Sequence, residues 1–238
     1  MFKIRILVLL VVVALLAGCG LASTTGSGNV VTQEEAISGF DRLDFDQGFQ
    51  VDVNQGEIFG VVIRVDDNLL EDVQVVKEGR TLKIGLKPGT SYNLVDVTLE
   101  ADVTMPELIG LDLSGGSHIT LKEFTSAAAL DAVLSGGSHL KGDVKADDVS
   151  FDLEGGSHVT LSGSAADLTV EAGGGSHAKL ADLQVVNASV MASGGSHATV
   201  NPSGTLDAVA KGGSHVKYLG SPTMGTIDDD GSSSIQQE

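Results

Sequence analysis

Apolar and polar residues alternate with a period of two through most of this chain, which indicates β-strands rather than helices. In the stretch 149–161 the apolar residues all share one parity: Val149, Phe151, Leu153, Val159 and Leu161. The same parity places Ser157 toward the core and His158 toward solvent. We expect Gly155 and Gly156 to allow a bend or bulge between two near-continuous strands.

The motif Gly-Gly-Ser-His occurs six times and contains every histidine of the 238-residue protein. Successive histidines are 21, 19, 19, 20 and 18 residues apart. Internal repetition at such a period is typical of solenoids, whereas a β-propeller blade needs about 40 residues. The Leu-x-x-Leu-x-Leu-x-x-Asn pattern of leucine-rich repeats is missing. The repeats at 111–222 therefore predict an all-β fold, a parallel β-helix with turns of about 20 residues.

The segments on either side of the repeats are less regular. Residues 30–110 are strand-rich, with a hairpin expected over 73–86, and are predicted to form irregular coils or a cap over the open N-terminal end of the β-helix. Residues 223–238 are interpreted as a C-terminal tail, with Asp228 to Glu238 expected to fray. By length alone, the mature chain could be one elongated domain or two compact ones.

The first 29 residues have the pattern of an export signal followed by a tether. Lys3 and Arg5 precede the apolar run 6–16, which is shorter than the ~20 residues of a membrane-spanning helix. The sequence Leu-Ala-Gly-Cys that ends at Cys19 resembles the lipobox of bacterial lipoproteins, which implies a signal peptide of residues 1–18 and a lipid on Cys19. Residues 19–29 are then the lipidated cysteine and a flexible tether. An ordinary secretory signal is the alternative, but Cys19 is the only cysteine, and lipidation gives it a role.

Export with a lipid anchor predicts a protein outside the cytoplasm, held on the cell membrane or the outer membrane. Removal of residues 1–18 leaves 12 basic side chains against 32 acidic ones, a net charge of −20. This charge argues against nucleic acid and anionic lipid as direct partners. The membrane is therefore expected to be contacted through the N-terminal lipid, and the extracellular or envelope partner, a protein or glycan, stays unidentified.

The six histidines are candidate metal ligands because their side chains are expected to form an outward ladder with a spacing of about 4.8 Å. The ladder comprises His118, His139, His158, His177, His197 and His215. Neighbouring imidazoles could share zinc, copper or nickel. The alternative is that the imidazoles stack without any ion, and in that case we expect no cofactor. The position two residues after each histidine alternates between threonine and lysine, and the lysine charge disfavours a bound cation.

No catalytic residues are assigned, and we expect no enzyme activity. The chain has four arginines, all outside the repeats, whereas glycan-cleaving β-helices need clustered carboxylates with calcium or an arginine base. Adjacent serine and histidine point to opposite faces of a strand, so they cannot form a nucleophile–base pair. A surface binding or adhesion module is the first functional hypothesis. A purely structural envelope protein and a metal-binding lipoprotein are the alternatives.

Several short motifs resemble the head-GIN-domain family, whose name describes autotransporter adhesins. They are Gly26–Asn29, Phe49–Val53, Asp67–Leu70, Met105–Leu108, Leu113–Gly115 and Tyr218–Pro222. The resemblance covers nearly all of the mature chain and implies a right-handed parallel β-helix, frequent lipid anchoring and no established catalytic residues. The family's usual turn is of the Ser-Gly-Ser-Gly-Asp/Asn type, so the histidines of Gly-Gly-Ser-His inherit no family function.

Overall fold

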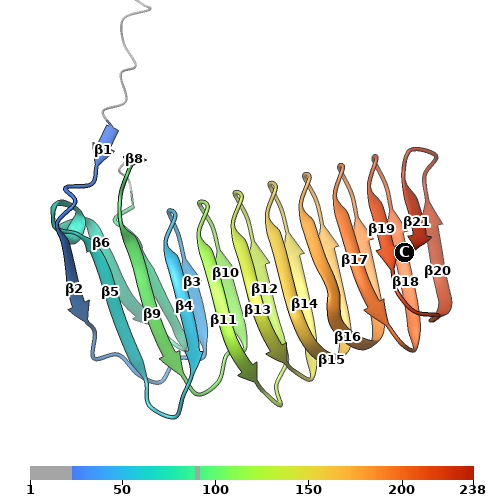
Figure 1. The fold of residues 1–238 in the computed structure, drawn as a ribbon, viewed down its shortest axis with the longest axis horizontal. Coiled ribbons are helices and arrows are strands. Elements are labelled where there is room, and N and C mark those ends of the chain that lie inside the picture. Colours follow the sequence, from blue (N-terminus) through green and yellow to red (C-terminus); the bar gives the residue numbers. More distant parts are fainter. Residues whose placement is uncertain (1–22, 89–91) are drawn as a thin grey trace, which may run out of the picture.

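The protein is an elongated β-solenoid (Figure 1). The computed structural model describes residues 23–88 and 92–238, so the predicted signal peptide and Cys19 lie outside the described residues. Each coil contributes one strand to each of two faces, and strands pair in parallel with their equivalents in the next coil. The predicted β-helix with turns of about 20 residues is confirmed.

One face of the solenoid is here called the histidine face, because in the six repeat coils its strand begins at the motif histidine. From the N-terminal end its strands are β9 (Leu99–Met105), β4 (Gln50–Gln55), β11 (His118–Thr125), β13 (His139–Lys145), the first parts of β15 (His158–Ala172) and β16 (His177–Ala192), β17 (His197–Pro202), β19 (His215–Tyr218) and β21 (Ser234–Gln237). Their pairing places each histidine directly beside the histidine of the next coil.

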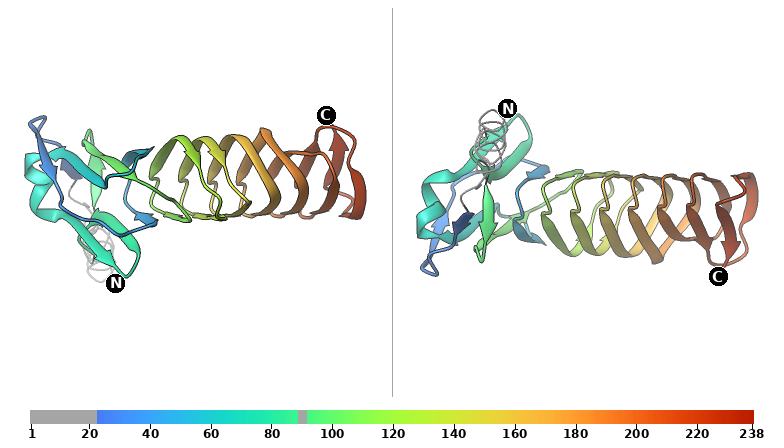
Figure 2. Two further views of the ribbon diagram at one scale, coloured as in Figure 1. Left: turned by 90° about the horizontal axis from the view of Figure 1, so that it is seen from below. Right: turned by 90° about the horizontal axis from the view of Figure 1, so that it is seen from above.

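The second face, here called the acidic face, runs along the other side of the coil. Its strands are β7 (Thr81–Leu86), β3 (Arg42–Phe45), β10 (Gly110–Leu113), β12 (Leu130–Leu134), β14 (Asp148–Leu153), the second parts of β15 and β16, β18 (Thr205–Ala210) and β20 (Thr223–Asp229). The two views of Figure 2 show both faces closing around a narrow interior.

The N-terminal end of the solenoid is capped, as the sequence predicts. On the histidine face β5 (Gly60–Asp66) adds antiparallel to β9 and β2 (Val30–Glu34) adds antiparallel to β5. On the acidic face β6 (Val73–Glu78) adds antiparallel to β7. The pair β6–β7 is the hairpin expected over 73–86. The 3-10 helix η1 (Asp67–Asp72) contributes the buried Leu69. Outside this layer β1 (Ser23–Thr25) pairs with β8 (Asn93–Val95), so residues 23–25 of the predicted flexible tether 19–29 form a strand instead.

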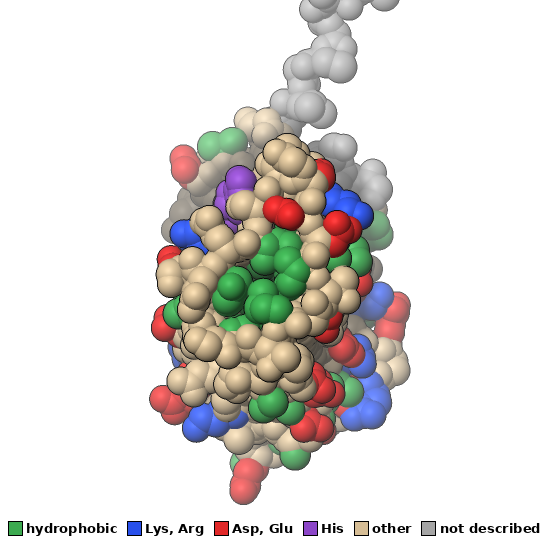
Figure 3. All heavy atoms as spheres, turned by 90° about the vertical axis from the view of Figure 1, so that its right-hand side faces the viewer, with side chains coloured by type: hydrophobic (Ala, Val, Ile, Leu, Met, Phe, Trp, Pro, Cys, Tyr) green, Lys and Arg blue, Asp and Glu red, His purple; other side chains and the backbone are tan. Residues whose placement is uncertain are grey.

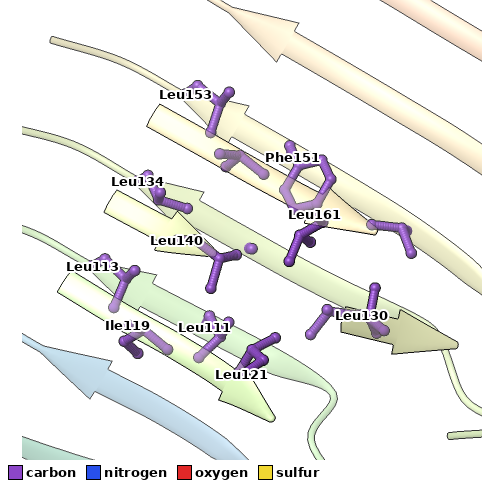
Figure 4. Close-up of a cluster of buried hydrophobic side chains, with 14 of the residues drawn as sticks. Leu111, Leu113, Ile119, Leu121, Leu130, Leu134, Leu140, Phe151, Leu153 and Leu161 are labelled. Carbon is purple, nitrogen blue, oxygen red and sulfur yellow. The ribbon is translucent and has the colours of Figure 1, made fainter. Parts of the chain in front are cut away.

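The core is a set of apolar columns that run along the solenoid axis between the two faces. Leucines of neighbouring coils lie above one another in Figure 4, because stacking of equivalent strands repeats each inward position every coil. All five inward residues of the 149–161 stretch are buried, and the six motif serines are fully buried beside them. The predicted parity is therefore correct on both sides of the glycines.

The Gly-Gly segment itself differs from the expected bend or bulge. Both glycines have positive φ, 65° and 79° at Gly136 and Gly137, and Ser138 N donates to Ser135 O across 3.3 Å. This is a tight two-residue turn that takes the chain from the acidic face to the histidine face. Period-two parity does not distinguish a bend from a turn here, because the serine after the glycines points inward in either case.

The C-terminal segment, expected to fray, instead completes a final coil. Strands β20 and β21 pair with β18 and β19. Asp230 stabilises the turn between them, because its carboxylate accepts hydrogen bonds from Gly212 N at 2.8 Å and Ser233 Oγ at 2.7 Å. These bonds hold the pKa of Asp230 well below its usual range. Figure 3 looks onto this end, where hydrophobic side chains fill the middle of the coil.

Candidate functional site: the histidine face

The six predicted histidines lie in a single column on the histidine face. Ring centroids of successive histidines from His118 to His197 are 4.5, 4.7, 4.7 and 5.0 Å apart, with interplanar angles of 8–16°. The last pair, His197 and His215, is 5.0 Å apart but tilted by 52°. The solenoid repeat thus produces a stack of nearly parallel imidazole rings, partly exposed at their edges.

The serines that precede the histidines form a matching column inside the turn. Ser157 Oγ donates to Glu154 O at 2.7 Å, and Ser157 N donates to Ser176 Oγ of the next coil at 3.2 Å. Ser214 makes both kinds of bond: its Oγ donates to Lys211 O at 2.8 Å and accepts from Ser196 N at 3.2 Å, whereas Ser117 Oγ has no partner among the described atoms. The full burial of the six serines confirms that motif serines and histidines face opposite ways, so no Ser–His catalytic pair forms at these motifs.

Two histidines of the ladder have a perturbed pKa. The pKa values of His139 and His177 are lowered from the ordinary 6.5, first by partial burial and then by the neighbouring imidazoles, which disfavour adjacent positive charges. Lys179 adds to the effect at His177. His158 Nδ1 is buried with no hydrogen-bond partner among the described atoms, while His215 Nδ1 contacts Ser234 Oγ at 2.8 Å. Burial and stacking therefore favour the neutral form of His139 and His177.

The ring geometry bears on the metal hypothesis. Nearly parallel rings point their nitrogen lone pairs in the same direction, so they do not converge on one ion unless the rings turn. Within residues 23–88 and 92–238, no cluster of three or more histidine, cysteine or acidic side chains is arranged to hold a metal. The outward Asp112, Asp152 and Glu171 belong to β10, β14 and the second part of β15, on the acidic face. The sharp turn thus places them across the solenoid from the histidines.

A second column lies beside the ladder, two residues further along each strand. It alternates by coil: Thr120, Lys141, Thr160, Lys179, Thr199 and Lys217. Lys141 and Lys179 are exposed and have no carboxylate within 4 Å among the described residues, whereas Lys217 contacts Glu238 at 3.5 Å. Two unpaired ammonium groups therefore stand next to the histidines of a strongly acidic protein.

The N-terminal end of the two columns opens into a groove of about 710 Å³ between the first repeat coils and the cap. Its wall includes Arg64 of β5, which contacts Asp102 at 2.6 Å and Glu100 at 3.0 Å. These contacts raise the pKa of Arg64. Asp52 of β4, also in the groove, contacts Lys122 at 2.8 Å. The three carboxylates of the groove are therefore each paired with a cation of the protein.

Two further turns, which lack the Gly-Gly-Ser-His motif, extend the columns at both ends. Gln50 of β4 pairs with His118, after a turn in which Gln47 and Gly48 have positive φ, and Ser234 of β21 pairs with His215. The spacing of 19 residues from His215 could have revealed Ser234. Gln50 gives no such signal, because the whole cap separates it from His118 in the sequence.

Comparison with known proteins agrees with this architecture. The family model described as "Putative auto-transporter adhesin, head GIN domain" matches residues 39–222, which span β3 to β19 and all six motifs. The chain belongs to this family. Head-GIN-domain membership and the solenoid fold together identify an adhesion-type module, and the family description names an adhesin rather than an enzyme. A search of the curated proteins found no match to the chain.

Solved structures share the fold of this head-GIN-domain chain at low sequence identity. A "putative adhesin" from Bacteroides fragilis NCTC 9343 has a TM-score of 0.83 at 18% identity, covering 91% of this chain and 100% of that one. A "putative lipid binding protein" from Parabacteroides distasonis ATCC 8503 has a TM-score of 0.73 at 22% identity, covering 91% and 99%. A "putative adhesin" from Parabacteroides merdae ATCC 43184 has a TM-score of 0.66 at 16% identity, with the same coverage. At these identities the likeness establishes the fold.

Proposed function

We propose that this protein is a non-enzymatic lipoprotein of the cell envelope that binds an extracellular or envelope partner through the outer surface of its solenoid. The observation that carries the proposal is the combination of head-GIN-domain membership with a solenoid that repeats one outward histidine six times. Repetition of one surface unit along an axis suits the binding of extended partners.

The position of Cys19 supports an anchor at the capped end. Cys19 precedes β1 at Ser23 by four residues, a stretch that extends to at most about 14 Å. Since β1 lies at the same end as the cap in Figure 1, a lipid on Cys19 would hold the cap close to the membrane. The repeat coils would then extend away from the attachment point. Within the described parts of the chain, no helix is both long and apolar enough to cross a bilayer.

The anchor is tested by expressing the full chain with Cys19→Ser beside the unchanged chain and fractionating the cells. Lipidation predicts that the unchanged chain partitions with membranes and takes up labelled fatty acid, whereas the Cys19→Ser chain does neither. Membrane partitioning of both proteins to the same extent would contradict the anchor. The variant Ala22→Ser, which changes another residue between Cys19 and β1, is the matched control and should behave as the unchanged chain.

Binding is tested with the mature chain carrying Cys19→Ser, so that no lipid contributes. Beads that display this protein should retain envelope material or whole cells in a saturable way, and soluble protein should compete for the same sites. Retention that soluble protein fails to reduce would contradict a specific binding surface. Self-association alone, with no retention of envelope material, would instead favour a purely structural role.

Metal binding by the ladder is the second candidate, because adjacent imidazoles lie only 4.5–5.0 Å apart and side-chain rotation could turn two of them toward one ion. The test is a calorimetric zinc and copper titration of chelator-treated protein and of a variant with all six histidines changed to asparagine. Micromolar binding that vanishes in the variant would support sequestration. Absence of histidine-dependent heat would leave the ladder as a stacking element.

A further inference from the structure

The two faces of the solenoid carry different charge patterns. In the repeat coils, the strands of the acidic face contain no lysine or arginine, and their exposed acids are Asp112, Asp131, Asp148, Asp152, Asp167, Glu171 and Asp207. The matching strands of the histidine face contain five lysines, Lys122, Lys141, Lys145, Lys179 and Lys217, together with the acids Glu123, Asp143 and Asp182. In a protein of net charge −18, the lysines of the repeat strands are thus all placed on one strip.

The centre of this strip is the pair Lys141 and Lys179. They occupy the same column two coils apart, which corresponds to about 9.6 Å, with Thr160 between them. Neither has a carboxylate within 4 Å among the described residues, although carboxylates outnumber cations more than twofold in the protein. In the adjoining groove each of the three carboxylates is already in contact with Arg64 or Lys122, which carry two positive charges against their three negative ones. The unpaired charge is therefore available to an anionic ligand from outside.

We propose that the histidine face binds a linear acidic polysaccharide, laid along the solenoid axis over the threonine–lysine column with one end in the groove beside Arg64. This proposal rests on the proposed binding function and names its ligand class. The lysines would pair with carboxylates of the glycan, while threonine hydroxyls and imidazole edges, repeated every coil, would hydrogen-bond sugar hydroxyls.

The charge spacing favours a glycan over a nucleic acid. Duplex DNA carries a negative charge about every 1.7 Å of its axis, far denser than lysines about 9.6 Å apart, so most of its phosphates would face no cation of the protein. A polyuronate, with charge diluted among neutral hydroxyls, matches a column in which lysine alternates with threonine. Exposed aromatic rings for sugar stacking are missing from the described threonine–lysine column, so charge must carry recognition and neutral glycans should not bind.

The test uses the mature chain with Cys19→Ser and polygalacturonate as the probe, in a titration followed by calorimetry. Lys141→Gln with Lys179→Gln should weaken the affinity about fivefold, as expected for the loss of two exposed ion pairs. The control pair Lys77→Gln with Lys87→Gln makes the same change in net charge on the cap, outside the column, and should stay within twofold of the unchanged protein. Fully methyl-esterified polygalacturonate, which keeps the backbone but loses the charge, should not bind.

Three outcomes would overturn the proposal: equal weakening by both lysine pairs, binding of the esterified polymer, or absence of binding to polygalacturonate. Inorganic polyphosphate and duplex DNA are the competing probes, and tighter binding of either through Lys141 and Lys179 would replace the glycan with a phosphate polymer. None of these outcomes would change the separate result of the bead experiment, in which the protein retains envelope material. Failure of the ligand assignment is thus distinguishable from failure of the binding function.

Discussion

The two glycines of each motif experience different surroundings, although both have positive φ. A Cβ added at Gly155 would lie 3.2 Å from Gly136 N of the preceding coil, whereas a Cβ at Gly156 would meet nothing within 4 Å. The first glycine therefore serves both the turn and the close approach of stacked coils. The second serves the turn alone.

This difference predicts unequal costs for alanine at the two positions. Gly156→Ala should lower the free energy of unfolding by about 1 kcal/mol through backbone strain alone. Gly155→Ala should lower it by about 2 kcal/mol, because the added methyl group also presses on the coil below. Urea unfolding of the two single variants measures the difference. Equal costs would show that the stacked turns can separate without penalty.

At the scale of elements, the histidine ladder links six strands through one kind of side chain. Partial burial and neighbouring rings lower the pKa values of His139 and His177. An imidazole whose pKa is lower in the folded chain binds a proton more readily after unfolding, so the unfolded state holds more protons in this range. Stability should therefore be complete above the ordinary value of 6.5 and fall as the pH drops below it.

The measurement is the urea midpoint at pH 7.5, 6.5 and 5.5. The unchanged protein should lose stability over this interval, and His139→Asn with His177→Asn should reduce that loss. Thr160→Asn with Thr199→Asn, on the neighbouring column, is the control and should keep the full pH dependence. A midpoint that is equally pH-dependent in the histidine variant would mean that these imidazoles do not govern the response.

At the scale of the whole molecule, stability comes from contacts between successive coils, so the solenoid should tolerate the loss of an entire repeat. His158 and His177 occupy equivalent positions. Deletion of residues 158–176 therefore joins Ser157 to His177 with the turn and the strand register intact. Each coil contacts only its neighbours, and the two new neighbours present the same inward parity.

The shortened protein should unfold cooperatively, with a denaturant m-value reduced by about a tenth because less surface is exposed on unfolding. Deletion of residues 158–166 is the control. It removes the histidine-face half of one coil, joins two consecutive strands of the acidic face and should abolish cooperative unfolding. Circular dichroism and urea titration report both results. Collapse of the whole-repeat deletion would show that the coils are not interchangeable.

Much of the fold was predictable because it follows from local alternation. The parity around Ser157 and His158 correctly separates inward from outward side chains, and the motif spacing predicts the coil length and the histidine column. These properties depend on side-chain direction along a single strand, which successive residues determine without reference to the rest of the chain.

Other features depend on how strands pack and pair. The turn at Gly155 and Gly156 puts consecutive strands on opposite faces, and this arrangement sends Asp152 away from His158 and separates the acidic face from the lysines. Only burial of one apolar face against the other decides between that turn and a bend. Likewise, β9 lies between β4 and β5, which are adjacent in sequence, and a pairing between such distant segments leaves no trace in local alternation.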